Sequence, residues 1–591
     1  MKKVWFVLIG SALLFCAKTY GSNDEVVYTA KQLKQIEEAK EYLKSADMDY
    51  PTLKYAEYAC IVGDIDFLKK MELHGFNQWN KSVLITQAIR FGHIACLKFI
   101  ISKGVDLKTN GEMALNEAAK KGSLDICSIL VANGADVKKA KLAMNYAAEK
   151  GNLKICELLV ANGADVNAKF GDWTALMHGA AYGHFEICKF LVDNGADVNA
   201  KSEQNDSALM LAAQKGHFEM CKFFVSKGAD INAKNARNDS ALLIAAIYGH
   251  IDICKFLIAN GAEINGKDKY NRTVLSEAAK HGHLDFCKFI ISNGAEINAT
   301  SDLALTSAAE NGHFEICKYL VSQGANVNAK GEGDCTILMF AAEKGSLGDC
   351  QFLITHGAAI DVKAKDGATA LIKAVMNGQL DIYKYLISQG ANANVTYGDG
   401  YTTLMLAAFS GHLDVCNFLV AQGMDLNARD RSGNSALHFS AGNGYAKVCI
   451  YLISKGADVN AKNENGYSAL HFAASNGHLE VCRILIANGA DVNAKDRDDE
   501  TVLMMAVGNG KIDVCKFLIS HGANVNAIRD DGTTALMFAA ARGDIELCKL
   551  LITSGANVNA TRIGGFSALR YALHFKHVDV ANYLKSVGAK W

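Results

Sequence analysis

The sequence has almost no net charge, and it lacks the short motifs that mark most catalytic and nucleotide-binding sites. Its 61 basic and 62 acidic residues leave a formal charge of −1, whereas a surface for nucleic acid or anionic lipid needs clustered basic side chains. The chain contains no glycine-rich phosphate loop, no His-Glu-x-x-His and no Cys-x-x-Cys. We therefore predict no nucleic-acid binding, no enzymatic activity, no catalytic residues and no cofactor.

Long apolar runs are also missing beyond the N-terminus, so no later segment predicts a membrane span. Residues 1–21 differ, because two lysines precede the apolar run Val4–Phe15, which is too short to cross a bilayer. This pattern is typical of a secretory signal peptide with cleavage after Gly21. We predict an exported protein whose mature chain begins at Ser22, and the Met-Lys-Lys start favours a bacterial periplasm or the extracellular medium.

Cys16 offers an alternative to simple secretion. The sequence Leu-Leu-Phe-Cys that ends there resembles a bacterial lipoprotein signal, and the protein would then be lipid-anchored through this cysteine. Phe15 is large for the residue that precedes a lipidated cysteine, so we favour cleavage after Gly21.

The dominant feature of the chain is a unit that recurs every 33 residues, seen most clearly in residues 171–203. Its central glycine, Gly183, recurs at this spacing down the chain, with one shorter step of 30 between Gly282 and Gly312. A fixed period of this size is typical of a stacked array, because each unit has an apolar face that only a neighbouring unit can cover.

The first half of the unit predicts a helix that begins after Thr174, whose side-chain oxygen can accept a hydrogen bond from a free backbone N–H. Serine takes the same position at 207, 240, 435, 468 and 567. Leu176, Gly179 and Ala180 share one face of this helix, and the two small residues allow another helix to approach closely.

A second helix is predicted to follow Gly183, with an inner face made by Ile187, Cys188, Leu191 and Val192. Gly195 stands where a helix ends in the left-handed conformation, which glycine adopts without strain. The run Ala-Asp-Val-Asn-Ala is extended and leads into a polar turn, which predicts a short β-hairpin. We call this projecting segment the finger of each repeat.

These features together resemble the ankyrin repeat. The chain departs from the family in the proline that usually follows the capping threonine, since Ala175 stands there and the only proline is Pro51. Proline at a first helical position is dispensable. The resemblance covers residues 51–591, and it implies an all-α repeat solenoid of stacked helix-turn-helix units with short projecting β-hairpins. The matching positions are Thr174, Leu176, Gly179, Ala180, Gly183, His184, Leu191, Gly195, Ala196 and Asp197.

The spacing divides the chain into five parts. Counting the turn glycines and the last unit gives 17 repeats. A shortened finger at Ala299–Leu303 predicts a gap in the row of fingers. The parts are a signal peptide (1–21), a capping segment with an amphipathic helix over 30–46 (22–50), irregular repeats that have lost finger residues (51–165), regular repeats (166–565) and a C-terminal capping repeat (566–591).

Fourteen of the 17 cysteines recur at the position of Cys188. So many cysteines in an exported protein would suggest disulfides. Equivalent residues of adjacent repeats, however, lie about 10 Å apart, beyond the ~7 Å that a disulfide allows between Cα atoms. We therefore predict a ladder of reduced, buried thiols, with an exposed thiol only at Cys335, which replaces a finger residue.

Two recurring patterns have a structural interpretation as well as a functional one. His184 and Cys188 could supply two metal ligands, but no third ligand accompanies them, and the resemblance implies that the histidine locks the turn between the helices. We predict no metal site. Asn205, Asn238 and Asn271 begin glycosylation sequons, and their recurrence at the repeat period indicates that they were inherited with the unit.

Function is expected where the repeats differ, because the shared positions are occupied by structural residues. The resemblance implies that the finger tips and the residues just before each turn glycine line the concave face of the array. Exposed aromatic residues are the usual anchors of protein interfaces. The predicted partner-binding residues form two groups, namely Trp173, Tyr182, Tyr248 and Tyr270, and Tyr397, Tyr401, Phe409 and Tyr467.

The sequence as a whole predicts an exported, non-catalytic, monomeric scaffold that binds a protein partner through the concave face and the finger tips. A host-directed secreted effector is one version of this function. The alternative is a structural spacer at the cell surface, either free or lipid-anchored.

Overall fold

The computed structural model describes residues 5–9, 12–16, 27–44, 53–72, 81–298 and 303–590. The chain divides into two compact units, and the division falls within one repeat, close to the predicted finger gap. The N-terminal unit comprises residues 1–278 and 292–295, and the C-terminal unit comprises residues 279–291 and 296–591. The finger gap itself, at 299–302, lies outside the described residues.

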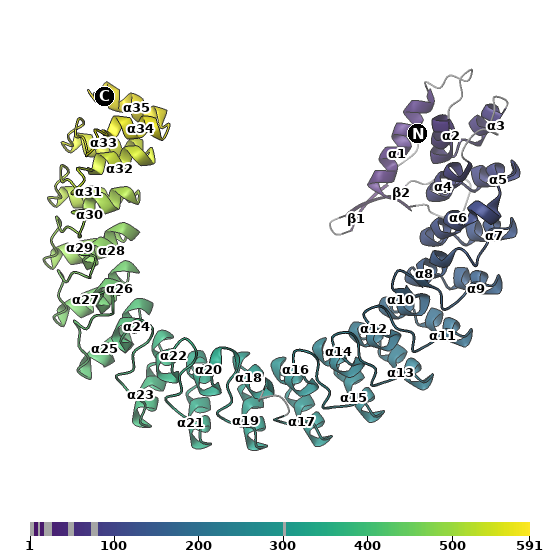
Figure 1. Cartoon of the computed structure of the whole chain (residues 1–591), viewed down its shortest axis with the longest axis horizontal. Coiled ribbons are helices and arrows are strands. Elements are labelled where there is room, and N and C mark those ends of the chain that lie inside the picture. Colours follow the sequence, from purple (N-terminus) through teal and green to yellow (C-terminus); the bar gives the residue numbers. More distant parts are fainter. Residues whose placement is uncertain are drawn as a thin grey trace. The chain divides into compact units, whose positions relative to one another are not determined.

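The N-terminal unit consists of helix pairs in which a first helix is followed by an antiparallel second helix (Figure 1). Its first helices are α2 (Leu53–Val62), α4 (Lys81–Phe91), α6 (Leu107–Lys121), α8 (Lys141–Glu149), α10 (Ala175–Tyr182), α12 (Ala208–Lys215) and α14 (Ala241–Ile247). Its second helices are α3 (Ile65–Glu72), α5 (Ile94–Ser102), α7 (Leu124–Ala132), α9 (Leu153–Ala161), α11 (Phe185–Asp193), α13 (Phe218–Ser226) and α15 (Ile251–Ala259). The pair α16 (Val274–Lys280) and α17 (Leu284–Ser292) contains the division between the units.

The C-terminal unit continues the same pattern to the last described residues. Its first helices are α18 (Leu303–Glu310), α20 (Ile337–Lys344), α22 (Ala370–Met376), α24 (Thr403–Ser410), α26 (Ala436–Gly442), α28 (Ala469–Asn476), α30 (Val502–Gly508), α32 (Ala535–Arg542) and α34 (Ala568–His574). Its second helices are α19 (Phe314–Ser322), α21 (Leu347–Thr355), α23 (Leu380–Ser388), α25 (Leu413–Ala421), α27 (Ala446–Ser454), α29 (Leu479–Ala487), α31 (Ile512–Ser520), α33 (Ile545–Thr553) and α35 (Val578–Ser586), and a short 3₁₀ turn, η2, covers Glu332–Asp334. The pairs from α2/α3 to α34/α35 number 17, as the glycine spacing predicted.

The first helix α10 begins and ends as the sequence predicts. In α10 the Thr174 hydroxyl accepts a hydrogen bond from the backbone N–H of Met177 at 3.3 Å. Gly183 ends the helix with a left-handed φ of 82°, a conformation that costs an L side chain free energy. Leu176 and Ala180 are buried in the core. The capping and burial predictions for this helix are confirmed.

The second helices carry the cysteine ladder into the core. Cys188 is fully buried between Ile187 and Leu191, which are also in the core. Burial raises the pKa of the Cys188 thiol to about 12, because desolvation disfavours the thiolate, so this cysteine is a small buried hydrophobe with little nucleophilic character. Val192, predicted on the inner face, is only half-buried, whereas Ile187, Cys188 and Leu191 make up the buried face of α11.

The first helices pack against one another more closely than the second helices do. Small residues make this approach possible. Ala212 and Ala213 in α12 and Ala245 and Ala246 in α14 are all buried at the contact between successive first helices. Because one row is tighter than the other, each unit is curved locally toward its first helices.

In several repeats a histidine at the start of the second helix links the repeat to the preceding one. His184 Nε2 lies 3.0 Å from the carbonyl oxygen of Glu149, at the end of the preceding first helix α8. Its ring lies against the preceding turn glycine, Gly151, where a Cβ atom would come within 2.8 Å of it. The histidine therefore holds a turn between two helices, and the turn is that of the preceding repeat, so its hydrogen bond also joins two repeats. The same hydrogen bond occurs at His93, His250, His412, His478 and His577.

A second link joins the bases of the fingers. Asn199 donates from Nδ2 to the carbonyl oxygen of Gly228 at 3.0 Å, and its Oδ1 accepts from the backbone N–H of Asp230 at 2.7 Å. Asn493 repeats both bonds in the C-terminal unit. A single amide side chain thus satisfies one donor and one acceptor of the next repeat, which fixes the distance between neighbouring fingers.

The fingers are short hairpins, as predicted. β4 (Lys169–Phe170) pairs with β5 (Trp173–Thr174), and five further fingers are closed by a single bridge, as between Lys234 and Ser240. Asn205, Asn238 and Asn271 adopt left-handed φ angles of 59°, 65° and 61° at the finger turns, a conformation that asparagine tolerates. The hydroxyl two residues after each of them caps the next helix, so both residues of each sequon have a structural role.

The segment before the repeats contains a small sheet and one helix. β1 (Trp5–Ile9) pairs antiparallel with β2 (Ala12–Cys16), and β2 pairs with β3 (Val27–Tyr28). α1 (Ala30–Lys44) packs along α2, in agreement with the predicted amphipathic helix. Residues 17–26 lie outside the described residues, and the signal peptide stays a prediction. Among the described helices, none has both the length and the apolar character that crossing a bilayer requires.

The core beneath α1 explains its capping position. Ala39 is fully buried in a cluster with Ile61 and Phe91, and Leu33 and Ile36 pack against the same cluster. A repeat at the end of a stack exposes an apolar face that must be covered. α1 covers this face for the first repeat.

The irregular repeats lose their fingers in the predicted way. In α6 the helix begins at Leu107, only four residues after α5 has ended at Ser102, and Asp106 accepts hydrogen bonds from the backbone N–H groups of Lys108 and Thr109. The residues that would form a finger elsewhere are part of this longer helix. The irregular repeats retain both helices because these contain the core residues. The finger is not needed for repeats to stack.

Candidate functional site

The candidate site lies on the first-helix face, which we define as the exposed sides of the first helices together with the fingers. In the N-terminal unit three of the predicted aromatic residues are exposed on this face. Tyr182 and Tyr248 are 57% and 54% exposed at the ends of α10 and α14, and Tyr270 is 61% exposed in a finger. Exposed tyrosines are favourable anchors for a partner because they offer a large apolar area and one polar group at low entropic cost.

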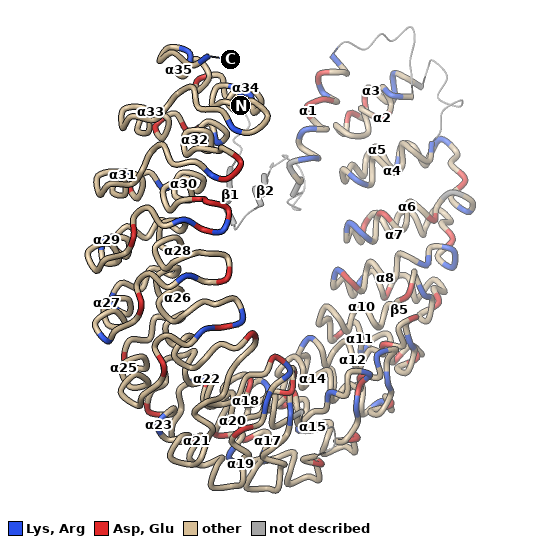
Figure 2. The backbone as a smooth tube through the Cα atoms, turned by 60° about the vertical axis from the view of Figure 1, so that its left-hand side comes forward, with Lys and Arg blue, Asp and Glu red and all other residues tan. Residues whose placement is uncertain are grey.

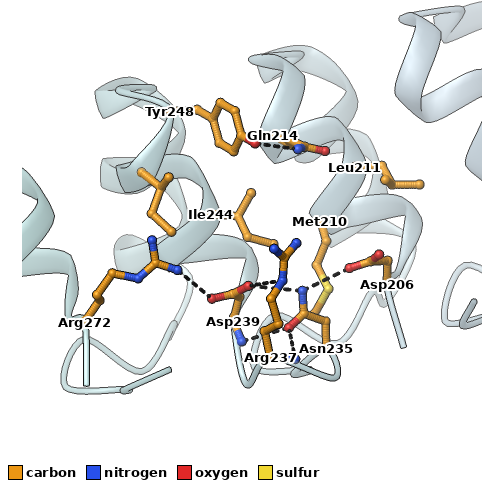
Figure 3. A pocket seen from close by; sticks show the side chains of 11 residues that line it. Asp206, Met210, Leu211, Gln214, Asn235, Arg237, Asp239, Ile244, Tyr248 and Arg272 are labelled. Carbon is orange, nitrogen blue, oxygen red and sulfur yellow. Dashed lines mark hydrogen bonds and ion pairs between the residues drawn. The ribbon is translucent and has the colours of Figure 1, made fainter. Parts of the chain in front are cut away.

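A cleft of about 170 Å³ opens on this face between α12 and α14 (Figure 3). The two helices supply its apolar wall, and the fingers supply charged residues at its base. We call it the Asp239 cleft. Its lining residues are Asp206, Met210, Leu211, Gln214, Asn235, Arg237, Asp239, Ile244, Ile247, Tyr248 and Arg272.

Asn235 organises the base of the Asp239 cleft. Its Nδ2 donates to Asp206 Oδ1 at 3.0 Å and to Asp239 Oδ2 at 3.3 Å. Its Oδ1 accepts from the backbone N–H groups of Arg237 and Asp239, both at 2.9 Å. One buried amide therefore holds two carboxylates side by side and fixes the backbone that carries Arg237.

Arg272 forms one side of the cleft, and three carboxylates surround its guanidinium group. Its Nε donates to Asp268 Oδ2 at 2.6 Å, and its Nη2 lies 3.7 Å from Asp239 Oδ1. Its Nη1 lies 4.0 Å from Glu277 Oε1. Burial lowers the pKa of Arg272, and the hydrogen bond and these negative charges outweigh it, so the pKa is raised overall. Arg272 is thus a structural cation, held by its hydrogen bond to Asp268 and by the negative charges of Asp239 and Glu277.

Tyr248 and Gln214 form the rim of the cleft. Gln214 Nε2 donates to the Tyr248 hydroxyl at 2.8 Å, so the exposed ring is held in place. Figure 3 shows this ring above Ile244, with the carboxylates on the opposite side of the cleft. A side chain entering here would meet an aromatic face, an apolar wall and then negative charge.

The C-terminal unit presents an aromatic row on its own first-helix face. Phe409 is 49% exposed, and the rings of Phe409 and Tyr401 both contact Phe439, at centroid distances of 6.1 and 5.4 Å. The Tyr397 hydroxyl donates to Asp366 Oδ2 at 3.2 Å. Burial raises the pKa of Tyr397, with a further contribution from Asp366, so this tyrosine is tied to a neighbouring finger.

Tyr467 lies at a second cleft in this unit. The cleft measures about 310 Å³ and is lined by Tyr467, Phe472 and Met505 together with polar residues. The ring of Tyr467 meets that of Phe472 edge-on at 6.2 Å. This cleft differs from the Asp239 cleft, because no carboxylate or guanidinium group is among its lining residues.

Two buried histidines near this row serve as parts of helix caps. His438 Nδ1 accepts a hydrogen bond from the backbone N–H of Ser435 at 3.1 Å, so its proton lies on Nε2, which contacts the Tyr467 carbonyl oxygen at 3.1 Å. His471 Nδ1 accepts in the same way from Ser468. Burial lowers the pKa of both histidines, to about 4 for His471. Both are held neutral by the fold.

Charged residues of opposite sign stand side by side on many of the fingers (Figure 2). Lys234 pairs with Glu263 at 3.2 Å, and Arg431 pairs with Asp399 at 3.1 Å, each across successive fingers. These pairs are exposed and contribute little to stability. Within the described residues no group of three or more histidine, cysteine, aspartate or glutamate side chains is placed to hold a metal ion.

A comparison with protein families agrees with the helix pairs, turn glycines and fingers. The family model described as ankyrin repeats (3 copies) matches repeatedly and with overlaps over residues 56–202 and 209–591. The chain belongs to the ankyrin repeat family. No curated protein gives a significant match to it.

Ankyrin repeats generally mediate protein–protein interaction, and proteins built from them are typically non-catalytic scaffolds. Family membership explains the positions that recur in every repeat, such as the capping hydroxyl and the turn glycine. It does not specify a partner, because the fold is shared by many binding specificities.

The eight aromatic residues predicted to bind a partner divide into two groups of equal size. Tyr182, Tyr248, Tyr270 and Phe409 are exposed. Trp173, Tyr397, Tyr401 and Tyr467 are half-buried, because their rings pack within the ankyrin array. Trp173, for example, lies 5.2 Å from the His178 ring, and its carbonyl oxygen accepts a hydrogen bond from Asn145.

Sequence reasoning missed residues at one further position of the first-helix face. Phe439, Phe472 and Met505 each lie five residues before a turn glycine and are half-buried next to the predicted aromatics. Leu211 and Ile244, in the wall of the Asp239 cleft, occupy the same position. The sequence feature that could have identified this position is its variability. The side chain here differs from repeat to repeat, whereas the buried core positions repeat leucine, alanine or cysteine.

Cys335 also differs from the prediction. It is half-buried rather than exposed, because it lies at the base of its finger. Burial raises the pKa of its thiol, with a counteracting contribution from Lys373. A thiol of this kind is a weak nucleophile at neutral pH.

Proposed function

We propose that this ankyrin repeat protein is a non-catalytic scaffold that binds a partner protein through its first-helix face and fingers. The observation that carries the proposal is the contrast between repeated and variable positions. Positions shared by the repeats are buried or bound to neighbouring repeats, whereas Tyr182, Tyr248 and Tyr270 remain exposed on one face. That face also holds the Asp239 cleft, where hydrogen bonds hold Asp206, Asp239 and Tyr248 in place before any partner arrives. Such preorganisation lowers the entropic cost of binding.

The proposal predicts that removing the exposed tyrosines abolishes partner capture. We expect the wild-type chain to retain a protein from the exported fraction of the native organism that a Tyr182→Ala, Tyr248→Ala, Tyr270→Ala variant does not retain. The loss should be at least about tenfold, since each anchor contributes more than ~1 kcal/mol at a typical interface. The measurement is affinity capture followed by mass spectrometry.

A matched control separates loss of the site from loss of apolar surface. Ile450 is 53% exposed on α27, a second helix, and Ile450→Ala should leave capture unchanged. Circular dichroism should show equal helicity for all three proteins. If the tyrosine variant captures the same protein as the wild type, the first-helix face of the N-terminal unit is not the binding site. If no protein is captured by any of them, the structural-spacer function is favoured.

We also propose that the protein is exported, on the basis of its N-terminal sequence. The pattern in residues 1–21 supports cleavage after Gly21. Mass spectrometry of the protein from its native host should find Ser22 at the N-terminus. A diacylated Cys16 would instead support the lipid-anchored form, and an intact Met1 would contradict export by this signal.

A further inference from the structure

We infer that the Asp239 cleft receives a lysine or arginine side chain of the partner protein, with its charged end between Asp206 and Asp239. This inference rests on the proposed function and adds the chemistry that the partner must supply. It depends on four features of the cleft: its volume, its charge, an incompletely bonded buried carboxylate and an exposed arginine within it.

The volume of the Asp239 cleft suits one side chain. Sites for metabolites and cofactors are usually about 300–1,000 Å³, whereas this cleft measures about 170 Å³. A guest of this size is a single protruding group on a larger molecule. An exposed loop or extended segment of a partner protein offers such a group.

The charge of the cleft favours a cationic guest. Four carboxylates, those of Asp206, Asp239, Asp268 and Glu277, stand against the two guanidinium groups of Arg237 and Arg272. Arg272 is already surrounded by three of these carboxylates. The unbalanced negative charge therefore lies on the side of Asp206 and Asp239, and an added cation would bring the cluster closer to neutrality.

Asp239 has an acceptor atom to spare. The residue is only 3% exposed, and its Oδ2 receives the hydrogen bond from Asn235. Its Oδ1 accepts no hydrogen bond from the described residues, and the nearest guanidinium nitrogen given by the structure, Arg272 Nη2, lies at 3.7 Å, beyond the usual N–H···O length of 2.7–3.2 Å. Leaving a buried carboxylate oxygen in this state is costly, and a donor from a guest would relieve the cost.

Arg237 occupies part of the cleft without being tightly held. Its side chain is 61% exposed. Among the described residues it forms a single ion pair, in which Nε lies 3.5 Å from Asp239 Oδ2. The backbone of Arg237 is fixed by Asn235, but the guanidinium group is free to swing toward solvent. We infer that the partner's cation takes the place of this guanidinium, so Arg237 competes with the partner.

The apolar wall fits the rest of a long basic side chain. The methylene groups of lysine and arginine pack along apolar surface while the charged end reaches a polar site. Leu211 and Ile244 provide such a surface between the rim and the carboxylates. Tyr248, held by Gln214, can contact the incoming cation through its ring face.

The test is selection of binding peptides from a random linear-peptide library displayed on phage, with the full chain as the target. Selected peptides that compete with one another are then measured against variants by fluorescence polarisation. We expect one lysine or arginine common to these peptides, and its replacement by norleucine should weaken binding on the order of tenfold. Binding should also weaken as salt concentration rises.

Two variants of the cleft should act in opposite directions. Asp206→Asn should weaken binding about tenfold, and Arg237→Ala should strengthen it about threefold, because an exposed competing ion pair is removed. Asp206→Asn is expected to fold, because Asn434 occupies the equivalent position of a later repeat and its Oδ1 accepts from Asn463 at 2.9 Å, just as Asp206 accepts from Asn235. A purely structural role of Asp206 would not make Arg237→Ala strengthen binding.

The possible outcomes separate this inference from the proposed function. Peptides that need Tyr182 and Tyr248 but no basic residue would overturn the inference and leave the scaffold function standing. Peptides with a required acidic residue, weakened by Arg237→Ala, would show that the cleft takes a carboxylate instead and would also overturn it. Failure to select any peptide that depends on the two tyrosines counts against binding at this face altogether.

Discussion

Replacement of Gly216 by alanine is expected to destabilise the N-terminal unit by about 3 kcal/mol, whereas Gly228→Ala in the same repeat should cost about 1 kcal/mol. Both glycines have left-handed φ angles, 77° and 84°, and alanine pays roughly 1 kcal/mol to adopt this conformation at either site. The two positions differ in what a Cβ atom would meet.

The additional cost at Gly216 comes from the link between repeats. A Cβ atom at Gly216 would lie 2.6 Å from Cε1 of His250, whereas a Cβ atom at Gly228 would have nothing within 4 Å. His250 would have to move, and its hydrogen bond with the Gln214 carbonyl oxygen, 3.2 Å long, would be lost. A buried or half-buried group left without its partner costs about 1–3 kcal/mol.

The last repeat contains a natural control for this argument. Lys576 occupies the position that corresponds to Gly216, with a left-handed φ of 63°. No following repeat places a histidine ring against it within the described chain, which ends at residue 590. Within the described chain, Lys576 is therefore accepted at the conformational cost alone.

Urea unfolding of the two variants, followed by circular dichroism, measures the predicted difference. Amide hydrogen exchange should place the extra loss for Gly216→Ala in α12 to α15, because each repeat contacts only its neighbours. Equal destabilisation by the two substitutions would show that the His250 link contributes nothing to stability.

Acidification from pH 7 to pH 4 is expected to destabilise the C-terminal unit by about 3 kcal/mol through His471 alone. Its pKa falls from an ordinary 6.5 to about 4 in the folded chain, first because of burial. A proton on Nδ1 would also face the backbone N–H of Ser468, which now donates to that atom. His438 is held in the same way and should add to the effect.

The direction of the effect follows from proton binding. Between pH 6.5 and 4 the unfolded chain binds a proton at His471 that the folded chain does not, so stability rises with pH over this window. The contribution is complete above about pH 7. It decreases by about 1.4 kcal/mol for each pH unit below 6.5.

The chain itself provides the substitution that tests this prediction. Met405 occupies the equivalent position of a neighbouring repeat, where its sulfur accepts from the backbone N–H of Thr402 at 3.4 Å. A His438→Met, His471→Met variant should therefore keep the caps and lose the dependence on pH. Urea unfolding at pH 7, 5.5 and 4.5 compares it with the wild type, and parallel loss of stability in both proteins would contradict the role of the histidines.

Several features could be predicted from the sequence because they depend on local chemistry repeated at a fixed period. Thr174 caps a helix and Gly183 ends one because each acts on the backbone within four residues. The burial of the cysteine ladder followed from the same period, since a position that repeats an apolar residue in every unit must face the neighbouring unit. These determinants gave the helix pairs, the number of repeats and the first-helix face.

Other features depend on contacts between repeats, which no single unit specifies. The sequence could not show that Trp173 and Tyr401 are half-buried whereas Tyr182 is exposed, because the burial of a finger residue depends on the side chain of the next repeat. It also could not show that the histidine of one repeat binds the carbonyl group of the preceding one. Residues about 35 positions apart become neighbours only when the array stacks.

The Asp239 cleft shows this difference most clearly. Asp206, Asp239 and Arg272 come from three successive fingers, and in the sequence each is one variable residue before a cap. Stacking brings them together with Asn235, so that two carboxylates share one buried amide and a third finger contributes the opposite charge. The sequence by itself determined which face carries the variable residues. Only the tertiary structure decided which of these residues form a site, because their charges interact across repeats and not along the chain.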